Sequence, residues 1–234
     1  MFPIQDNNPS RTAPIVNWIL ILINVIVFLG ELSMDSHELS AFVKHFGVTP
    51  YYFIHYPTAP EEMYSLFTSM FLHGGWFHLI SNMWALFIFG DNIEDRLGHI
   101  PYLVFYIFCG IVAALTQVFM EPGQLQPTIG ASGAIAGVLG AYAMLFPSAK
   151  VMTLIPIGFI PWFINIPAYF YLGFWFVTQA FTGLISLNST VAKTAAENVA
   201  FFAHIGGFLT GFILVKLVQK QDYREWHPDE YMPY

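Results

Sequence analysis

The sequence predicts an all-α membrane protein of six transmembrane helices, arranged around a fourth helix that is short and buried. Three observations lead to this fold class. Of the 234 residues, 56% are hydrophobic and only 10% are charged, whereas a soluble domain carries about 25% charged residues. The apolar residues gather in six stretches, most of them near the length of about 20 residues that spans a bilayer. One stretch is shorter, so protein or water must cover one of its ends.

The six stretches define the expected spans. The fourth would extend only about 24 Å as a helix, at about 1.5 Å per residue. The hydrocarbon layer is about 30 Å thick, so this helix should end inside it. The expected spans are 13–32, 64–90, 101–120, 132–147, 166–187 and 199–218.

The basic residues predict the orientation. An even number of spans places both termini on one side, and Lys and Arg gather on the cytoplasmic side of membrane proteins. The terminal side holds Arg11, Arg96, Lys150, Lys216, Lys220 and Arg224, against Lys44 and Lys193 opposite. We therefore expect a multi-pass membrane protein with both termini in the cytoplasm.

The chain divides into a cytoplasmic segment 1–12, a membrane domain 13–219 and a cytoplasmic tail 220–234. Residues 33–63 form a long connection of a kind that is usually functional or lies on the membrane surface. Residues 151–165 are apolar but broken by proline and glycine, which predicts an interfacial segment with Trp162 at headgroup level. No signal peptide is predicted.

Composition excludes several classes of function. The net charge of −7 provides no basic patch for nucleic acid. The single cysteine, Cys109, excludes an internal disulfide and a cysteine-based zinc site. The chain also lacks the His-Glu-x-x-His pattern of a zinc protease. An intramembrane aspartyl site of the Gly-x-Gly-Asp type would need glycine in place of Ile88.

Ser132 opens the fourth span within Gly130-Ala131-Ser132-Gly133. A serine at this place is most often an N-cap. However, its neighbours allow close backbone approach, and small residues follow at helical spacing, as in helices that pack tightly in membranes. The sixth span offers a matching face at Ala203, Gly207 and Gly211. If these faces meet, His204 lies over Ser132.

His204 is therefore the candidate base for a Ser132 nucleophile. A lone histidine in an apolar helix is more often a hydrogen-bonded packing residue. Ionisable groups at membrane depth are nevertheless usually functional. The acidic stretch 91–96 should lie a membrane thickness away as a capping and ion-pair loop, and Glu197 about two turns away. The pattern thus predicts a Ser–His pair without a carboxylate.

His78 and Asn82 share one helix face at the start of the second span. They could form an inter-helix hydrogen bond, or they could be donors that stabilise an oxyanion. Nearby, His73 precedes a Gly-Gly pair and is expected to shape the loop.

With these motifs in place, the chain resembles the rhomboid intramembrane serine proteases, in the basic six-span form of bacteria and archaea. The matching elements are Gly130-Ala131-Ser132-Gly133, His78-x-x-x-Asn82, residues 92–98 and Ala203-His204-x-x-Gly207-x-x-x-Gly211. Two positions depart from the family pattern. Tyr64-Ser65 replaces the common Trp-Arg, and Ala136 replaces an aromatic residue that often stacks on the base.

The resemblance implies a hydrolase in which Ser132 is the nucleophile, His204 the general base, and His78 and Asn82 the oxyanion donors. It implies transmembrane proteins as substrates, the lipid bilayer as surroundings, and neither cofactor nor metal. Gly130 and a gate on the fifth span, Phe174 and Trp175, are expected to meet the substrate. Phe201, Phe202 or an aromatic of the fifth span could take the place of the missing aromatic. A non-catalytic rhomboid-like binder and a small transporter are the alternatives.

Overall fold

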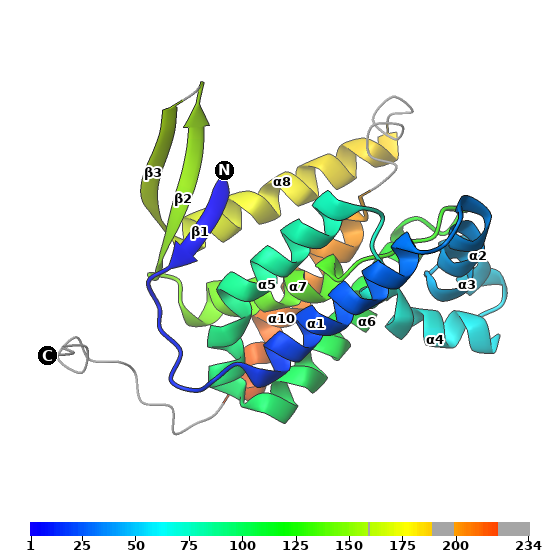
Figure 1. Cartoon of the computed structure of the whole chain (residues 1–234), viewed down its shortest axis with the longest axis horizontal. Coiled ribbons are helices and arrows are strands. Elements are labelled where there is room, and N and C mark those ends of the chain that lie inside the picture. The colour runs from blue at the N-terminus through cyan, green and yellow to red at the C-terminus, as the bar shows by residue number, and fades with distance from the viewer. Residues whose placement is uncertain (159, 189–198, 220–234) are drawn as a thin grey trace, which may run out of the picture.

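The protein is described here by a computed structural model that covers residues 1–158, 160–188 and 199–219. Its helices form a bundle with a small sheet at one end and three short helices at the other (Figure 1). In chain order the elements are β1 (Phe2–Asp6), α1 (Ile15–Leu32), α2 (Ser36–Phe46), α3 (Pro50–His55), α4 (Pro60–Thr68), the 3-10 helix η1 (Ser69–Phe71), α5 (Trp76–Leu97), α6 (His99–Met120), α7 (Ser132–Leu145), β2 (Lys150–Ile157), β3 (Ile160–Pro167), α8 (Ala168–Asn188) and α10 (Phe201–Val218).

Four of these helices, α1, α6, α8 and α10, are long and apolar enough to cross a membrane. Their outward faces carry large exposed apolar side chains, such as Leu22 on α1 and Val104 on α6. Exposure of so much apolar surface to water is unfavourable. In an integral membrane protein, lipid covers it. The two other expected spans correspond to α5, which carries polar residues towards both ends, and to α7, which has 14 residues. Six spans therefore stay a prediction.

Helix α7 is short and buried, as the sequence predicts. Every residue from Gly133 to Tyr142 is buried, and α5, α6, α8 and α10 pack around it. The small-residue faces of α7 and α10 meet, which confirms the expected packing. A Cβ on Gly207 would collide with the carbonyl of Gly133, and one on Gly211 with the carbonyl of Gly137. The two backbones therefore touch, as small residues allow in membranes.

The helices alternate between two ends of the bundle. At one end, the Gly130 amide donates to the Ser69 carbonyl over 2.8 Å, and the start of α7 meets α10. We call this the site end. At the other, Arg96 Nη2 donates to Gln219 Oε1 over 3.1 Å, and the side-chain Nδ2 of Asn92 donates to the Asn8 carbonyl over 2.6 Å. We call this the sheet end; both the first strand and the last described residue lie there.

The acidic stretch 91–96 was expected as a loop but forms the last turns of α5, which is a correction. Glu94 and Asp95 are buried and bind the start of α1. Glu94 accepts from the amides of Val16 and Asn17 over 2.9 and 2.7 Å, and Asp95 accepts from Thr12. The expected capping role thus holds. A helix can carry these charges because the positive end of α1 compensates them.

The prediction of an all-α fold is wrong in one respect, because residues 150–167 form an antiparallel hairpin that pairs with β1 (Figure 1). The β-branched residues of this segment favour strands, and Gly158 adopts φ +60° at the turn. The expected interfacial segment 151–165 therefore lies in a β-hairpin, and its location at the membrane interface stays a prediction. Trp162 and Phe163 are exposed on this hairpin.

Two other boundaries differ from expectation. The expected second span 64–90 is divided between α4, η1 and α5, because the Gly74-Gly75 pair interrupts it. The long connection 33–63 is largely helical, with α2, α3 and the start of α4. Lys193, Glu197 and the expected tail 220–234 lie outside the described residues.

Candidate active site

Ser132 and His204 are hydrogen-bonded to each other at the site end. The Oγ atom of Ser132 lies 2.8 Å from Nε2 of His204. Ser132 is the first residue of α7, and His204 lies in the first turn of α10. The two glycine-lined helices can approach closely because their residues are small. This approach places the hydroxyl and the imidazole in contact.

Ser132 does not cap its helix, so the N-cap alternative fails. The N-cap position belongs to Ala131, and no side chain caps the helix. The first amides of a helix have no partner within it, and the helix dipole makes this end attractive to negative charge. The start of α7 therefore presents backbone N–H donors beside the Ser132 hydroxyl, which is hydrogen-bonded to His204.

His78 and Asn82 of α5 face the same place. A Cβ on Gly130 would lie 2.6 Å from Nε2 of His78 and 3.8 Å from Nδ2 of Asn82. The Gly74 amide donates to Nδ1 of His78 over 3.4 Å, so the hydrogen of the neutral ring is on Nε2. Among the described residues, Nδ2 of Asn82 has no hydrogen-bond partner. The structure thus brings two donors from α5 beside Gly130, two residues before Ser132.

Gln179 of α8 is a partner of His204 that sequence reasoning missed. Its Oε1 atom lies 2.7 Å from Nδ1 of His204. Trp175, one turn earlier, places its ring 5.6 Å from the imidazole, centroid to centroid, at 37°. Trp175, an aromatic residue of the fifth expected span, thus lies beside the base. It takes the place of the aromatic residue that Ala136 replaces in the family pattern. The signal for Gln179 was a lone amide in an apolar helix, which is costly in lipid unless it has a partner.

Two further contacts support this arrangement. Gln117 of α6 accepts from the Ala203 amide over 3.3 Å and so binds the first turn of the helix that carries His204. The ring of His73 packs edge-on against His78, with centroids 5.0 Å apart. The His73 amide in turn donates to the buried carboxylate of Glu31 over 3.2 Å. His73 therefore packs against His78 as well as shaping the loop.

The two expected gate residues lie differently. Phe174 is 59% exposed on the outer surface of α8. Trp175 turns inwards, against His204 and Phe208 of α10. Only the second of them belongs to the site geometry.

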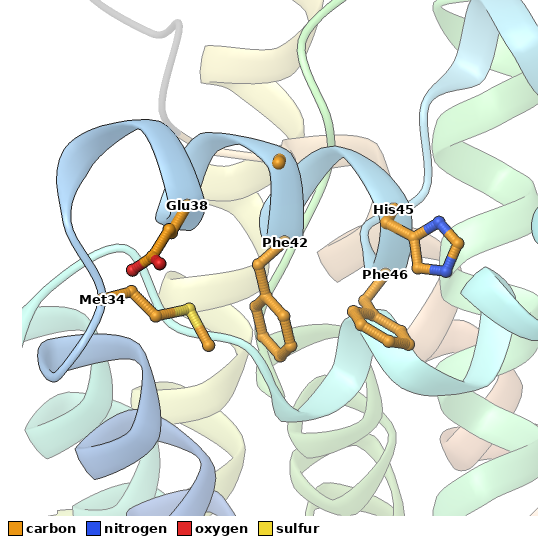
Figure 2. A pocket seen from close by; sticks show the side chains of 6 residues that line it. Met34, Glu38, Phe42, His45 and Phe46 are labelled. Carbon is orange, nitrogen blue, oxygen red and sulfur yellow. The ribbon is translucent and has the colours of Figure 1, made fainter.

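Metal centres and surface hollows are two other kinds of binding site. Within the described ranges, no group of three His, Cys, Asp or Glu side chains could hold a metal ion. A hollow on the surface of α2 (Figure 2) contains none of the site residues. It is lined by Met34, Glu38, Ala41, Phe42, His45 and Phe46.

The geometry defines a class of protein: a helical membrane protein with a Ser–His pair at the end of a buried helix. Comparison with known proteins then defines the family. The Rhomboid domain family matches residues 60–221, which is more than half of the chain. The chain therefore belongs to the rhomboid family.

Curated relatives agree with this assignment. The chain is 27% identical to "Putative rhomboid protease YdcA" of Bacillus subtilis, over 92% of this chain and 94% of that protein. It is 27% identical to "Rhomboid-like protein 11, chloroplastic" of Arabidopsis thaliana, over 92% of this chain and 70% of that one. It is 29% identical to "Rhomboid protein 1, mitochondrial" of Saccharomyces cerevisiae, over 68% of this chain but only 44% of that protein. The chain thus spans less than half the length of some curated relatives.

Proposed function

We propose that the protein is an intramembrane serine endopeptidase that cleaves transmembrane substrates near the outer face of the membrane through a Ser132–His204 pair. The observation that carries the proposal is the 2.8 Å contact between Ser132 Oγ and His204 Nε2. A hydroxyl becomes a useful nucleophile when a base within this distance removes its proton. Membership of the rhomboid family and the name of the Bacillus relative support a protease.

In the first step, His204 takes the Ser132 proton while Oγ attacks a substrate peptide carbonyl. The imidazolium then gives this proton to the amide nitrogen, the carbon–nitrogen bond breaks, and the new amino terminus leaves. In the second step, water gives a proton to His204 and attacks the acyl ester. The proton returns to Ser132 Oγ, and the new carboxyl terminus leaves.

Negative charge develops on the carbonyl oxygen in both steps. We assign its stabilisation to His78, Asn82 and the Ser132 backbone amide. The Nε2 hydrogen of His78 and the unpartnered Nδ2 of Asn82 border Gly130. Donors that are already in place cost no reorganisation during the reaction. The absence of a side chain on Gly130 leaves room for the substrate carbonyl beside them.

Substrate and orientation belong to the same proposal. A peptide bond within a helix is shielded, so the substrate helix must unwind locally before attack. We place the substrate entry at α8, with Phe174 and Trp175 as gate. The sheet end, which holds β1 and the end of α10, is assigned to the cytoplasm of a prokaryotic cell, and the site end to the outer face.

The test is cleavage of a transmembrane substrate by purified, detergent-solubilised protein, beside Ser132→Ala and His204→Ala. We expect activity in the wild type and a loss of about 10³-fold or more in each variant, since the pair acts as a unit. A fluorophosphonate probe should label Ser132 in the wild type and spare both variants. Cleavage that survives in folded Ser132→Ala would disprove the assignment, and neither cleavage nor labelling in the wild type would favour a non-catalytic binder.

A further inference from the structure

His204 is held by contacts from two helices. Its Nε2 atom faces Ser132 of α7, and its Nδ1 atom faces Gln179 of α8 over 2.7 Å. A neutral imidazole carries its hydrogen on one nitrogen only, and the other nitrogen can then accept. The base must therefore have its hydrogen on Nδ1, so that Nε2 is free to take the proton of Ser132.

We propose that Gln179 is a positioning residue that fixes His204 in this tautomer and orientation. The amide oxygen of Gln179 can only accept, so it requires the hydrogen of the imidazole on Nδ1. Asparagine performs this task in Cys-His-Asn proteases, and a carboxylate performs it in serine proteases. The inference rests on the proposed function and adds a third, uncharged member to its catalytic pair.

The side chains that can orient the His204 ring come from α8. Among the described residues, no carboxylate is hydrogen-bonded to His204. The titratable side chain that interacts with it electrostatically is His78 of α5. Ala136, on the neighbouring turn of α7, is too small to stack on the ring. Trp175 stacks there instead, and with Gln179 it lies at spacing i, i+4, on one face of α8.

The position of Gln179 also connects the base to the proposed gate. The same helix that presents Gln179 inwards carries Phe174 on its exposed face. Any displacement of α8 away from α10 removes the acceptor from Nδ1. The base is therefore complete only while α8 lies against α10.

The experiment uses the full chain in detergent. Gln179→Leu removes the acceptor at similar volume, and Gln179→Glu keeps an acceptor and cannot donate. Thr182→Val, an exposed position on the same helix, is the matched control. The measurements are kcat and KM for a transmembrane substrate, the rate of fluorophosphonate labelling, and the thermal unfolding midpoint.

We expect Gln179→Leu to lower kcat and the labelling rate by about 10-fold or more, as part of the 10²–10⁴-fold effect of general base catalysis. KM and the unfolding midpoint should stay close to those of the wild type and of Thr182→Val. Gln179→Glu should restore most of kcat and move the acidic limb of the pH–rate profile to higher pH, because a carboxylate stabilises the imidazolium.

The tautomer can be read directly by nitrogen-15 NMR of histidine-labelled protein, with His204 assigned by its loss in His204→Ala. We expect a hydrogen on Nδ1 in the wild type and a shift towards Nε2 in Gln179→Leu. A wild-type tautomer with its hydrogen on Nε2 would overturn the proposal, even in protein that proves inactive. An active wild type with an equally active Gln179→Leu would overturn it and leave the protease assignment intact.

Discussion

Gly130 and His78 meet at the start of α7, where a Cβ on Gly130 would lie 2.6 Å from Nε2 of the imidazole. Real side chains do not approach so closely, and Gly130 also has φ +122°, where an L-residue is strained. The glycine of the Gly-x-Ser-Gly motif therefore leaves room for the His78 ring, which we propose as an oxyanion donor, in addition to allowing a sharp turn before Ser132.

The first prediction follows from this contact. Gly130→Ala should lower kcat by about 10²-fold, because a shift of about 1 Å in a catalytic group has an effect of this size. The matched control is Gly30→Ala on α1, where a Cβ meets nothing within 4 Å. Activity assays of both variants, with unfolding midpoints, provide the check. Equal kcat values for the two folded variants would refute the role of Gly130.

The second prediction concerns Asn82. Its side-chain nitrogen is buried and unpartnered in the described part of the chain, so Asn82→Ala should leave the unfolding midpoint unchanged or higher. Its kcat should fall by about 10²–10³-fold, the usual effect of losing one oxyanion donor. Kinetics and thermal unfolding in detergent test both parts. A large loss of stability with normal kcat would instead favour the inter-helix hydrogen bond.

Much of the site could be predicted because its residues lie in short motifs. Helical spacing places His78 and Asn82 on one face, and the small residues around Ser132 and His204 predict that their helices touch. Gln179 has no such local pattern, and only the three-dimensional packing of α8 on α10 shows its partner.

The fold was less predictable where distant contacts decide it. The hairpin 150–167 is stabilised by pairing with β1, more than 140 residues earlier, for example Phe2 with Leu154. Similarly, the acidic stretch 91–96 suggested a loop. In the structure it is helical, and the first amides of α1 donate hydrogen bonds to the Glu94 carboxylate. Local composition cannot report such partners.

The third prediction is a pH dependence of stability at the sheet end. Burial, reinforced by the charge of Asp91, raises the pKa of Asp6 from 3.8 to about 6, while a hydrogen bond from the hydroxyl of Tyr142 opposes this shift. The folded state thus binds the proton more tightly than the unfolded state. The resulting stabilisation is complete below about pH 4 and is lost as the pH rises through about 6.

Asp6→Asn keeps an oxygen for Tyr142 but cannot ionise. Its unfolding midpoint should therefore exceed that of the wild type at pH 7.5, and the two should converge as the pH falls towards 4. Glu61→Gln, which changes an exposed carboxylate on α4, is the control. A midpoint lowered equally at every pH would show that the ionised Asp6 stabilises the fold.

The last prediction separates the two residues of the proposed gate. Phe174 faces outwards, and in the described part of the chain its ring does not pack against the ring of His204. Phe174→Ala should therefore raise or preserve cleavage of a transmembrane substrate. Trp175 packs against His204 and Phe208, so Trp175→Ala should widen the gate but also loosen the base. We expect Trp175→Ala to lower the fluorophosphonate labelling rate, which does not depend on substrate entry, whereas Phe174→Ala should leave it unchanged. The comparison of cleavage with labelling thus distinguishes entry from catalysis. Lower cleavage in folded Phe174→Ala, with unchanged labelling, would show that this side chain binds the substrate and does not block its entry.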